Sequence, residues 1–448
     1  MVNDKKIVNS WAFYDWSNSV YNLVITATIF PIYYKTVTET KDNLTGEVIR
    51  NTVNIFGLEL KNTSLYDFAI AFAYLLTASL SPILSGIADY GGSKKKFMMF
   101  FTYLGAISCG LMYFFTKDSL LFGILLAILA CIGYSGSLVF YNAYLPEIAS
   151  SDMHDRVSAK GFSLGYIGSS ILLILNLIMV LKPELFGFNN TGDATRFAFL
   201  TVGIWWLGFA QIPFYFLPKG VSNKANESQI LLKGYRELNK VWKSLKQYHY
   251  ITKFLTAFFV YSMGVQTVML VANHFGSQEI TYTDDNNVVH YGMESGQLIT
   301  TILIIQFVAM GGAYLFSFVS RKKGNLFTLK AATLIWALIC ISTFFFVKTP
   351  VHFYMVAAFV GLVMGGIQAL SRSTYSKLIP ETEDPTSYFS FYDVCEKLSI
   401  VLGMATFGFI NELSSSMRVP IIALMIFFIA GFILLSRIPK TKLLAALN

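Results

Sequence analysis

The chain has 448 residues, of which 54% are hydrophobic and only 13% are charged, and its formal net charge is +8. Soluble proteins contain about 25% charged residues, so this chain cannot cover a water-facing surface. The mean hydropathy of +0.55 and the 40 Phe and 25 Tyr residues suit lipid-facing and interfacial positions. The composition therefore excludes a soluble globular protein and indicates an all-α protein that crosses the membrane many times.

The cysteines give no sign of a metal site or a disulfide framework. All four lie in apolar stretches: Cys109, Cys131, Cys340 and Cys395. We expect them to be buried small hydrophobes, and we expect no metal and no cofactor. Lys5 and Lys6 precede the first apolar stretch, and no small-residue cleavage site follows it. This predicts an uncleaved membrane helix rather than a signal peptide.

Twelve apolar stretches are long enough to cross a bilayer as helices. They fall at roughly 11–34, 65–87, 97–115, 120–144, 161–181, 197–217, 254–275, 297–319, 327–347, 351–370, 388–410 and 419–435. An even number places both termini on the same side. The longest polar interruption predicts an N-terminal six-helix half over 1–217, a linker over 218–250 and a C-terminal six-helix half over 251–448. The polar loops at 36–63 and 276–295 suit short hairpins.

The loop charges predict the orientation. On the side of the termini the loops and ends carry 22 Lys and Arg residues, and on the opposite side they carry nine. Cytoplasmic loops are enriched in these residues, so both termini and the linker are predicted to be cytoplasmic. This topology also accounts for the net positive charge, and a nucleic-acid partner is not needed.

The first span carries an unusual number of polar groups. Asp15, Asn18 and Asn22 are three and four residues apart and therefore share one helix face. Intramembrane polar residues nearly always face a protein interior or a water-filled path, so we expect this face to line a translocation pathway. For Asp15 the alternative is a helix cap or a structural ion pair. For the Asn residues it is plain interhelical hydrogen bonding.

The turn after the second span reads "SGIADYGGSKKK" over 85–96. It resembles the loop signature of the major facilitator superfamily, in which Gly is followed by three residues, Asp, Arg, any residue, Gly and two basic residues. Asp89, Gly92 and Lys94 match, whereas Ser85 and Tyr90 replace the first Gly and the Arg. The resemblance implies a gate loop whose Asp89 lies at the start of the eleventh helix and stabilises the outward-facing state. The alternative is a merely solvated turn.

The next signals lie in spans four and five and in the linker. Glu147 follows Pro146 at the end of span four. We expect it to be a gate residue near Arg156 and to join the charge network of spans ten and eleven. Gly161 and Gly165 on span five, like Gly361 and Gly365 on span ten, allow close helix packing.

In the linker, apolar residues recur at helical spacing among Lys and Arg, which predicts a basic amphipathic helix on the cytoplasmic leaflet. A calmodulin-like partner is the alternative.

The second half contributes two further polar faces. Gln266 and Asn273 share a face of span seven, and Gln368 and Arg372 share a face of span ten. We expect both faces to line the pathway.

Span eleven carries Asp393, Glu396 and Lys397 at a depth similar to that of Arg372. We expect these four to neutralise one another, with Arg372 balanced by Asp393 and Glu396. They form either a fixed structural network or a switch in which Asp393 or Glu396 takes up a proton.

Several stretches over nearly the whole chain resemble the vacuole-effluxer family. They are "YDWSNSVYNLVITATIFPIYY", "SPILSGIADYGG", "FYNAYLPEIA", "GVQT", "GGIQALSRSTYSKLIP" and "YFSFYDVCEKLS". The family was defined by a fungal autophagy-related protein that exports amino acids from the vacuole, and it has bacterial members. The resemblance implies a major facilitator fold in which the first, fourth, seventh and tenth helices line the cavity. Family members often carry an acidic residue before the "GxxT" of span seven, where this chain has Ser262 and Met263.

The resulting prediction is a secondary active transporter that exports a small polar metabolite, an amino acid by resemblance, through alternating access with H+ as the coupling ion. Its expected partners are this small-molecule substrate and the lipid bilayer, and we expect a monomer in a bacterial plasma membrane. The alternatives are a transporter of sugars, nucleosides or peptide fragments, and a non-transporting receptor or lipid-handling protein. An enzyme is not expected, because no Ser–His–Asp or paired-His arrangement is present.

Overall fold

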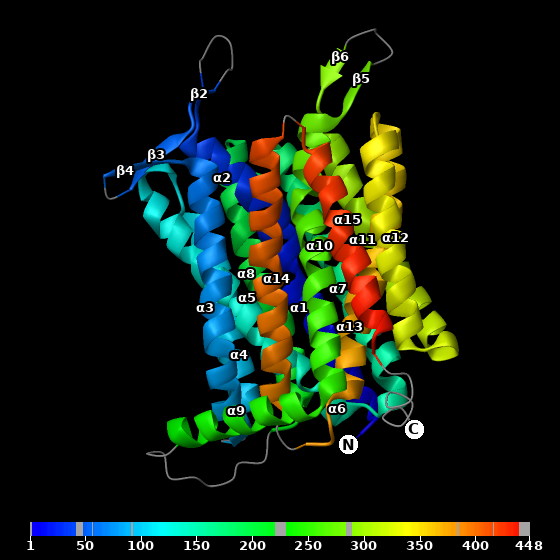
Figure 1. The fold of residues 1–448 in the computed structure, drawn as a ribbon. Helices are drawn as coiled ribbons and strands as arrows, with labels where there is room; N and C mark the ends of the chain where they lie inside the picture. Colours follow the sequence, from blue (N-terminus) through cyan, green and yellow to red (C-terminus); the bar gives the residue numbers. More distant parts are fainter. Residues whose placement is uncertain are drawn as a thin grey trace.

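The computed structural model describes residues 2–41, 48–55, 57–90, 93–219, 230–283, 289–382, 385–414 and 416–438. Long helices run side by side in one bundle (Figure 1). The first helix begins and the last helix ends at the same end of the bundle, which we call the terminus end. The helix that links the two halves of the sequence lies crosswise at this end, and β-hairpins lie at the opposite end.

The helices fall into two groups along the chain. The N-terminal group comprises α1 Lys5–Val20, the π-helix η1 Tyr21–Ile29, α2 Phe30–Thr38, α3 Asn62–Tyr90, α4 Lys94–Leu111, α5 Leu120–Asn142, α6 Leu145–Ile148, α7 His154–Leu181 and α8 Thr191–Phe216. The linking helix is α9 Ile230–Gln247. The C-terminal group comprises α10 His249–Glu279, α11 Ser295–Lys323, α12 Asn325–Phe346, α13 Pro350–Leu378, α14 Pro385–Leu413 and α15 Arg418–Ser436. Short 3-10 turns are η2 Met112–Phe114, η3 Lys117–Ser119, η4 Ser151–Met153 and η5 Pro183–Phe186.

The hairpins expected in the two long polar loops are confirmed. In the loop between α2 and α3, β1 Thr40–Lys41 pairs with β2 Val48–Arg50, and β3 Thr52–Ile55 pairs with β4 Leu58–Lys61. In the loop between α10 and α11, β5 Thr281–Thr283 pairs with β6 Val289–Tyr291. All pairs are antiparallel.

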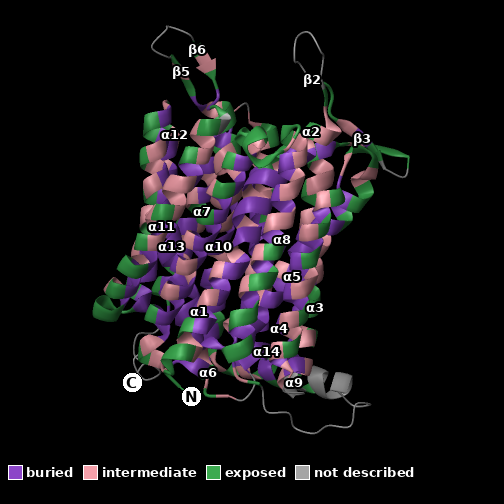
Figure 2. Cartoon of the chain, turned by 180° about the vertical axis from the view of Figure 1, so that it is seen from behind, coloured by how far each residue is buried: buried purple, intermediate pink, exposed green. Residues whose placement is uncertain are grey.

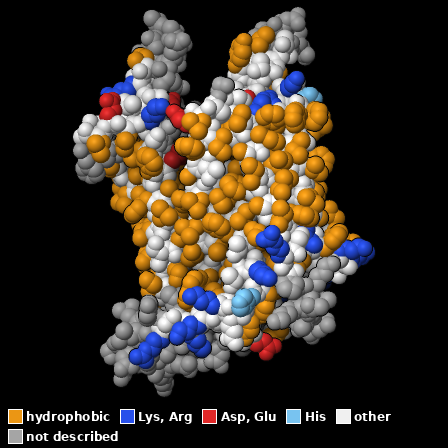
Figure 3. All heavy atoms as spheres, in the orientation of Figure 1, with side chains coloured by type: hydrophobic (Ala, Val, Ile, Leu, Met, Phe, Trp, Pro, Cys, Tyr) orange, Lys and Arg blue, Asp and Glu red, His pale blue; other side chains and the backbone are white. Residues whose placement is uncertain are grey.

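Within the described residues, ten helices are long and apolar enough to span a bilayer. The segment α1–η1–α2, which carries Asp15, and helix α14, which carries Asp393 and Lys397, run in the same bundle. Each of the twelve predicted spans falls on one of these helices or on the α1–η1–α2 segment, while the count of twelve membrane crossings and their orientation stay predictions. Figure 3 shows a wide hydrophobic band across the face in view, with Lys and Arg side chains gathered below it toward the terminus end. The burial pattern in Figure 2 places the buried residues along the inside of the bundle.

The first span is not a continuous α-helix, as hydropathy alone would suggest. In η1, Phe30 donates its backbone N–H to the carbonyl of Ile25, and the Thr28 hydroxyl donates to the carbonyl of Leu23 at 2.7 Å. Both reach back five residues, the spacing of a π-helix. Pro31 follows and lacks the N–H that would bond the carbonyl of Ala27 in an α-helix. Here Asn273 of α10 donates to that carbonyl at 3.4 Å.

Buried apolar side chains form two large cores. One core consists almost entirely of residues from helices α1–α8, and the other consists almost entirely of residues from helices α9–α15. Between the two groups, α7 packs on α11 and α13, and α3 packs on α14. The polar residues of interest lie along this interface between the groups.

Candidate functional site

A central cavity of about 150 Å3 lies between the two groups. Its walls come from α1, η1, α3, α5 and α7 on one side and from α10, α11, α13 and α14 on the other. Charged residues of both signs face it: Asp15, Arg372, Glu396 and Lys397. Aromatic side chains form much of the remaining wall: Tyr74, Tyr134, Phe162, Tyr166, Phe258, Tyr261 and Tyr392.

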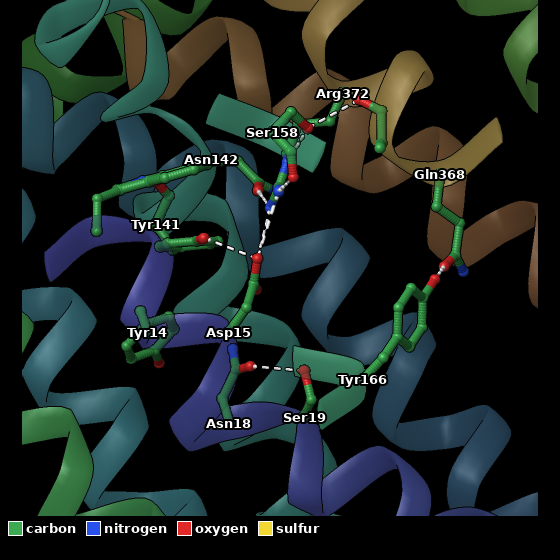
Figure 4. A network of polar contacts seen from close by, with 12 residues as sticks. Tyr14, Asp15, Asn18, Ser19, Tyr141, Asn142, Ser158, Tyr166, Gln368 and Arg372 are labelled. Atoms are coloured by element: carbon green, nitrogen blue, oxygen red, sulfur yellow. Dashed lines mark hydrogen bonds and ion pairs between the residues drawn. The ribbon is translucent and has the colours of Figure 1, made fainter. Parts of the chain in front are cut away.

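A buried ion pair crosses the interface beside the cavity. Arg372 of α13 lies with its Nη1 at 3.3 Å from Oδ2 of Asp15 on α1, and the two side chains are 3% and 6% exposed. The Tyr141 hydroxyl donates to the same Asp15 oxygen at 2.8 Å. Figure 4 shows Asp15 between Tyr141 and the guanidinium. A buried charge pair is stable only where further hydrogen bonds support it, and here Oδ2 of Asp15 accepts from Tyr141 and from both Nη atoms of Arg372.

The rest of the guanidinium is also held by the N-terminal group. Its Nε donates to the Ser158 hydroxyl and its Nη2 to the Ser158 carbonyl, both at 2.9 Å, and its Nη1 donates to Asn142 at 3.3 Å. Its central carbon lies 4.2 Å from the ring centre of Phe162 and 4.8 Å from that of Trp11. Arginine stacks well on aromatic faces, so Arg372 is fixed in a cage of the opposite group.

Close helix packing makes this geometry available. A Cβ atom at Gly161 of α7 would meet the Asp15 carboxylate and would lie 3.0 Å from both Arg372 Nη2 and the Tyr141 hydroxyl. A Cβ atom at Gly165 would meet the Ser19 hydroxyl. The prediction of close packing at these glycines is therefore confirmed. Gly361 and Gly365 of α13 lie equally close to the backbone of α11.

The predicted partner of Arg372 was wrong. The similar positions of these residues along their predicted spans suggested Asp393 and Glu396, but the carboxylate beside Arg372 is Asp15. Asp393 and Glu396 instead pair with Lys397 of their own helix, each at 3.0 Å. The reason is geometric: Asp393 and Lys397 are four residues apart and meet on one face of α14, whereas Arg372 points across the interface to Asp15.

The α14 cluster holds two carboxylates and one ammonium. Asp393 is 4% exposed and also accepts from the Ser81 hydroxyl of α3 at 3.1 Å. Glu396 is 24% exposed, faces the cavity and accepts from the Gln266 amide at 3.3 Å. If all three groups are charged, the cluster carries one unbalanced negative charge, and Glu396 is its more accessible carboxylate.

The remaining predicted pathway residues divide into two kinds. Asn22, Gln266 and Gln368 line the cavity, and Gln368 accepts from the Tyr166 hydroxyl at 2.7 Å. Asn18 is fully buried and does not appear in the cavity wall; its Oδ1 accepts from the Ser19 hydroxyl at 3.4 Å. Asn273 also lies outside the wall, where it bonds the backbone of η1 as described above.

The gate loop makes the contact that the resemblance implied. Asp89, near the end of α3, accepts a hydrogen bond from the backbone N–H of Ser387 in the first turn of α14 at 2.7 Å. The first N–H groups of a helix have no intrahelical partner, and a carboxylate there also suits the helix dipole. Gly92 lies outside the described residues.

The expectation that Glu147 joins the charge network of Arg372 and α14 was also wrong, whereas its role as a gate residue near Arg156 stays a prediction. Glu147 forms an ion pair with Lys94, whose ammonium lies 4.0 Å from the ring centre of Tyr144. The short helix α6 and the start of α4 place the two side chains together within the N-terminal group.

A second buried network at the terminus end was not predicted. Asp155 of α7 is 1% exposed and accepts from Lys377 of α13, Ser320 of α11 and Asn325 of α12, each at 2.8 Å. Lys377 lies five residues beyond Arg372, so this network is about 8 Å closer to the helix ends. Each residue alone looks like a solvated loop residue in the sequence. Only the pairing of α7 with the C-terminal helices brings them together.

Comparison with known proteins agrees with this architecture. Residues 3–445 match the model of the family described as "Vacuole effluxer Atg22 like". YxiO of Bacillus subtilis (strain 168), an uncharacterized MFS-type transporter, is 28% identical over 440 residues, covering 96% of this chain and 94% of that protein. Autophagy-related protein 22 of Yarrowia lipolytica is 23% identical over 454 residues, covering 82% and 74% of the two chains.

Solved structures show the same fold at low identity. The MFS proton:xylose symporter XylE, bound to 6-bromo-6-deoxy-D-glucose, matches with a TM-score of 0.71 at 13% identity over 99% of this chain and 98% of that one. The MFS transporter FucP in the outward conformation matches with a TM-score of 0.66 at 12% identity over 97% and 98%. These relatives and structural neighbours are transporters rather than enzymes. This chain is therefore an integral multi-pass membrane protein with the major facilitator fold, and it belongs to the Atg22-like vacuole effluxer family.

Proposed function

We propose that this protein exports an amino acid from the cytoplasm across a bacterial plasma membrane by alternating access, coupled to protons. The observation that carries this proposal is the presence of both charge signs on the walls of one small cavity. A zwitterion presents an ammonium and a carboxylate, which Asp15 and Arg372 complement. An uncharged sugar would leave both charges without a ligand partner.

The size of the cavity supports a small substrate. An internal space of about 150 Å3 accommodates a molecule of roughly the size of benzene, so a peptide fragment or a nucleoside would need a wider cavity. The aromatic wall offers apolar contact area for a side chain, and Gln266, Gln368 and the Tyr166 hydroxyl offer hydrogen bonds. Pockets of this kind typically combine apolar walls with a few well-placed polar groups.

The proposed movement is a rocking of the two helix groups about the cavity. Three sets of contacts join the groups on the terminus side: Asp15 with Arg372, Asp155 with its three partners, and Asp89 with Ser387. We infer that the structure is the state closed at that end, which the loop charges assign to the cytoplasm. Opening that end separates these partners. A substrate that binds Asp15 and Arg372 replaces their contact with each other and so weakens the first of these three sets.

We assign the coupling proton to the α14 cluster. Protonation of Glu396 leaves one carboxylate, Asp393, opposite one ammonium, Lys397, and removes the unbalanced charge. Because Glu396 faces the cavity and bonds Gln266 of α10, a change in its charge alters a contact between two cavity helices. The proton and the substrate therefore meet in the same cavity through different carboxylates.

Counterflow in proteoliposomes tests the proposal. Purified protein is reconstituted with an unlabelled pool of amino acids, sugars and nucleosides inside, and the same compounds are offered outside in labelled form, one class at a time. Accumulation of amino acids, altered by an imposed pH gradient, is the expected result. Accumulation of sugars or nucleosides alone would contradict the substrate class. No counterflow of any compound by well-folded protein would favour a receptor or a lipid-handling protein.

A further inference from the structure

Helix α9 touches both helix groups at the terminus end. It lies crosswise beneath the bundle (Figure 1) and packs on α3 of the N-terminal group and on α14 of the C-terminal group. Val241 and Leu245 are buried, and the Ser244 hydroxyl lies 2.6 Å from the hydroxyl of Tyr388 on α14. The contact between Asp89 and Ser387 joins the same two helices, α3 and α14.

The opposite face of α9 is basic and exposed. Arg236, Lys243 and Lys246 are spaced by seven and three residues, so they follow one side of the helix. Lys240 between them is exposed as well. In Figure 3, Lys and Arg side chains gather in this region, directly below the hydrophobic band of the bundle.

We propose that this basic face binds the headgroups of anionic phospholipids in the leaflet at the terminus end. The helix lies across the bundle axis at the edge of the apolar band, the depth at which headgroups lie. Its cations are attracted to an anionic leaflet. Trp242 is 48% exposed, stacks on Phe391 of α14 with ring centres 5.6 Å apart and lies beneath Lys246, as suits an interfacial ring.

The buried apolar face argues for lipid over a calmodulin-like partner. Such a partner encloses the apolar face of a basic amphipathic helix, but Val241 and Leu245 of α9 already pack against the bundle. Among the described side chains of α9, the exposed ones are charged or polar except Trp242. Because α9 rests on α3 and α14 together, lipid bound to it stabilises the contact between these helices. Anionic lipid therefore favours the state closed at the terminus end, whatever the substrate is.

Hydrogen–deuterium exchange in lipid nanodiscs tests this inference. The full chain is compared in discs of phosphatidylcholine and in discs of phosphatidylcholine and phosphatidylglycerol in equal parts. We expect phosphatidylglycerol to slow exchange in α9, in the last turns of α3 and in the first turns of α14. Each cation should contribute up to about a fivefold slowing, reduced by added salt.

The test variant is Arg236→Gln/Lys243→Gln/Lys246→Gln, which should lose the effect of phosphatidylglycerol. The matched control is Arg321→Gln/Lys322→Gln/Lys323→Gln at the end of α11, where the three side chains are equally exposed at the same end of the bundle. The control should keep the effect. If the test variant does not fold, Lys243→Gln alone should show a partial loss.

Three results would overturn the inference. The first is equal slowing by phosphatidylglycerol in the wild type and in the test variants. The second is slowing of the same segments by inorganic phosphate in phosphatidylcholine discs, which would indicate a soluble anion as the ligand. The third is protection of α9 by calmodulin but not by phosphatidylglycerol, which would indicate a protein partner.

Discussion

At the scale of single residues, Arg372 is the side chain on which the described site depends most. It belongs to the C-terminal group, yet its described hydrogen-bond acceptors are Asp15, Asn142 and Ser158 of the N-terminal group. A guanidinium cannot lose its charge in this setting. Its stability in the bundle therefore depends on Asp15 staying ionised and close to it.

Replacing Arg372 with Ala should destabilise the protein, and removing the matching carboxylate should restore it. Breaking a buried pair commonly costs about 3–5 kcal/mol because one charge stays buried alone. We expect Arg372→Ala to lower the thermal unfolding temperature in detergent, and Arg372→Ala/Asp15→Asn to recover most of the loss. Arg372→Ala/Asp393→Asn is the control, and an equal recovery by that double variant would contradict the pairing.

Replacing Glu396 with Gln should remove the pH dependence of transport while leaving the protein folded. The amide keeps the size of the side chain, and Glu396 is partly exposed to the cavity. Asp393→Asn should instead lower stability, because its carboxylate is buried between Lys397 and Ser81. The measurement is counterflow as a function of pH beside a thermal unfolding assay. Unchanged pH dependence in Glu396→Gln would assign the proton to another group.

The sequence predicts residues of this site more reliably than their partners. The helical spacing of Asp15 and Asn22 predicted a shared face, and both line the cavity. The contact of Asp89 with the start of α14 followed from a family resemblance. The partner of Arg372 could not be predicted from depth alone, because helix rotation decides which carboxylate it meets. For the same reason Asn273 was expected in the pathway and instead bonds the carbonyl of Ala27 beside Pro31.

At the scale of elements, the approach of α7 to α1 determines whether the ion pair can form. We expect Gly161→Ala to destabilise the protein by about 1–3 kcal/mol, the usual cost of overpacking, and to impair transport. Its Cβ would meet Asp15 and crowd Arg372 and Tyr141. Gly208→Ala on α8 is the matched control, because a Cβ there has no neighbour within 4 Å. Equal thermal stability of the two variants would contradict this packing argument.

Helix positions were predictable from hydropathy, but helix ends were not. The predicted span 161–181 lies inside α7, which begins at His154, and the predicted span 254–275 lies inside α10, which runs over His249–Glu279. Hydropathy reports only the part that suits the bilayer core, whereas backbone hydrogen bonds continue the helix beyond it. These extensions matter, because Asp155 lies on one and Lys377 on another.

At the scale of the whole molecule, we propose that contacts between the groups on the terminus side determine the conformational equilibrium. Asp155→Asn should favour the state open at that end, because Lys377 then lacks its carboxylate. A loss of about 1.4 kcal/mol in the closed state shifts the equilibrium about tenfold. The readout is labelling of a cysteine at Ser262, a cavity residue, with the four native cysteines replaced. An impermeant reagent is applied from the terminus side.

Asp193→Asn is the control for this shift. Asp193 pairs with Arg196 of the same helix near the opposite end of the bundle, and both side chains are partly exposed. Such surface pairs contribute little, so labelling at Ser262 should not change. Equal labelling rates in Asp155→Asn and the wild type would show that this network does not contribute to closure.

The proposed transport site is the cavity between the two groups, and Asp15 takes part in it. The most direct measurement is amino-acid counterflow by Asp15→Asn in proteoliposomes across a range of pH, beside its thermal unfolding temperature. We expect Asp15→Asn to unfold at a lower temperature than the wild type, because Arg372 then lacks its carboxylate, but to stay folded at the assay temperature and to have lost amino-acid transport. Full transport with normal pH dependence in Asp15→Asn would contradict it, as would a loss of stability without a specific loss of transport.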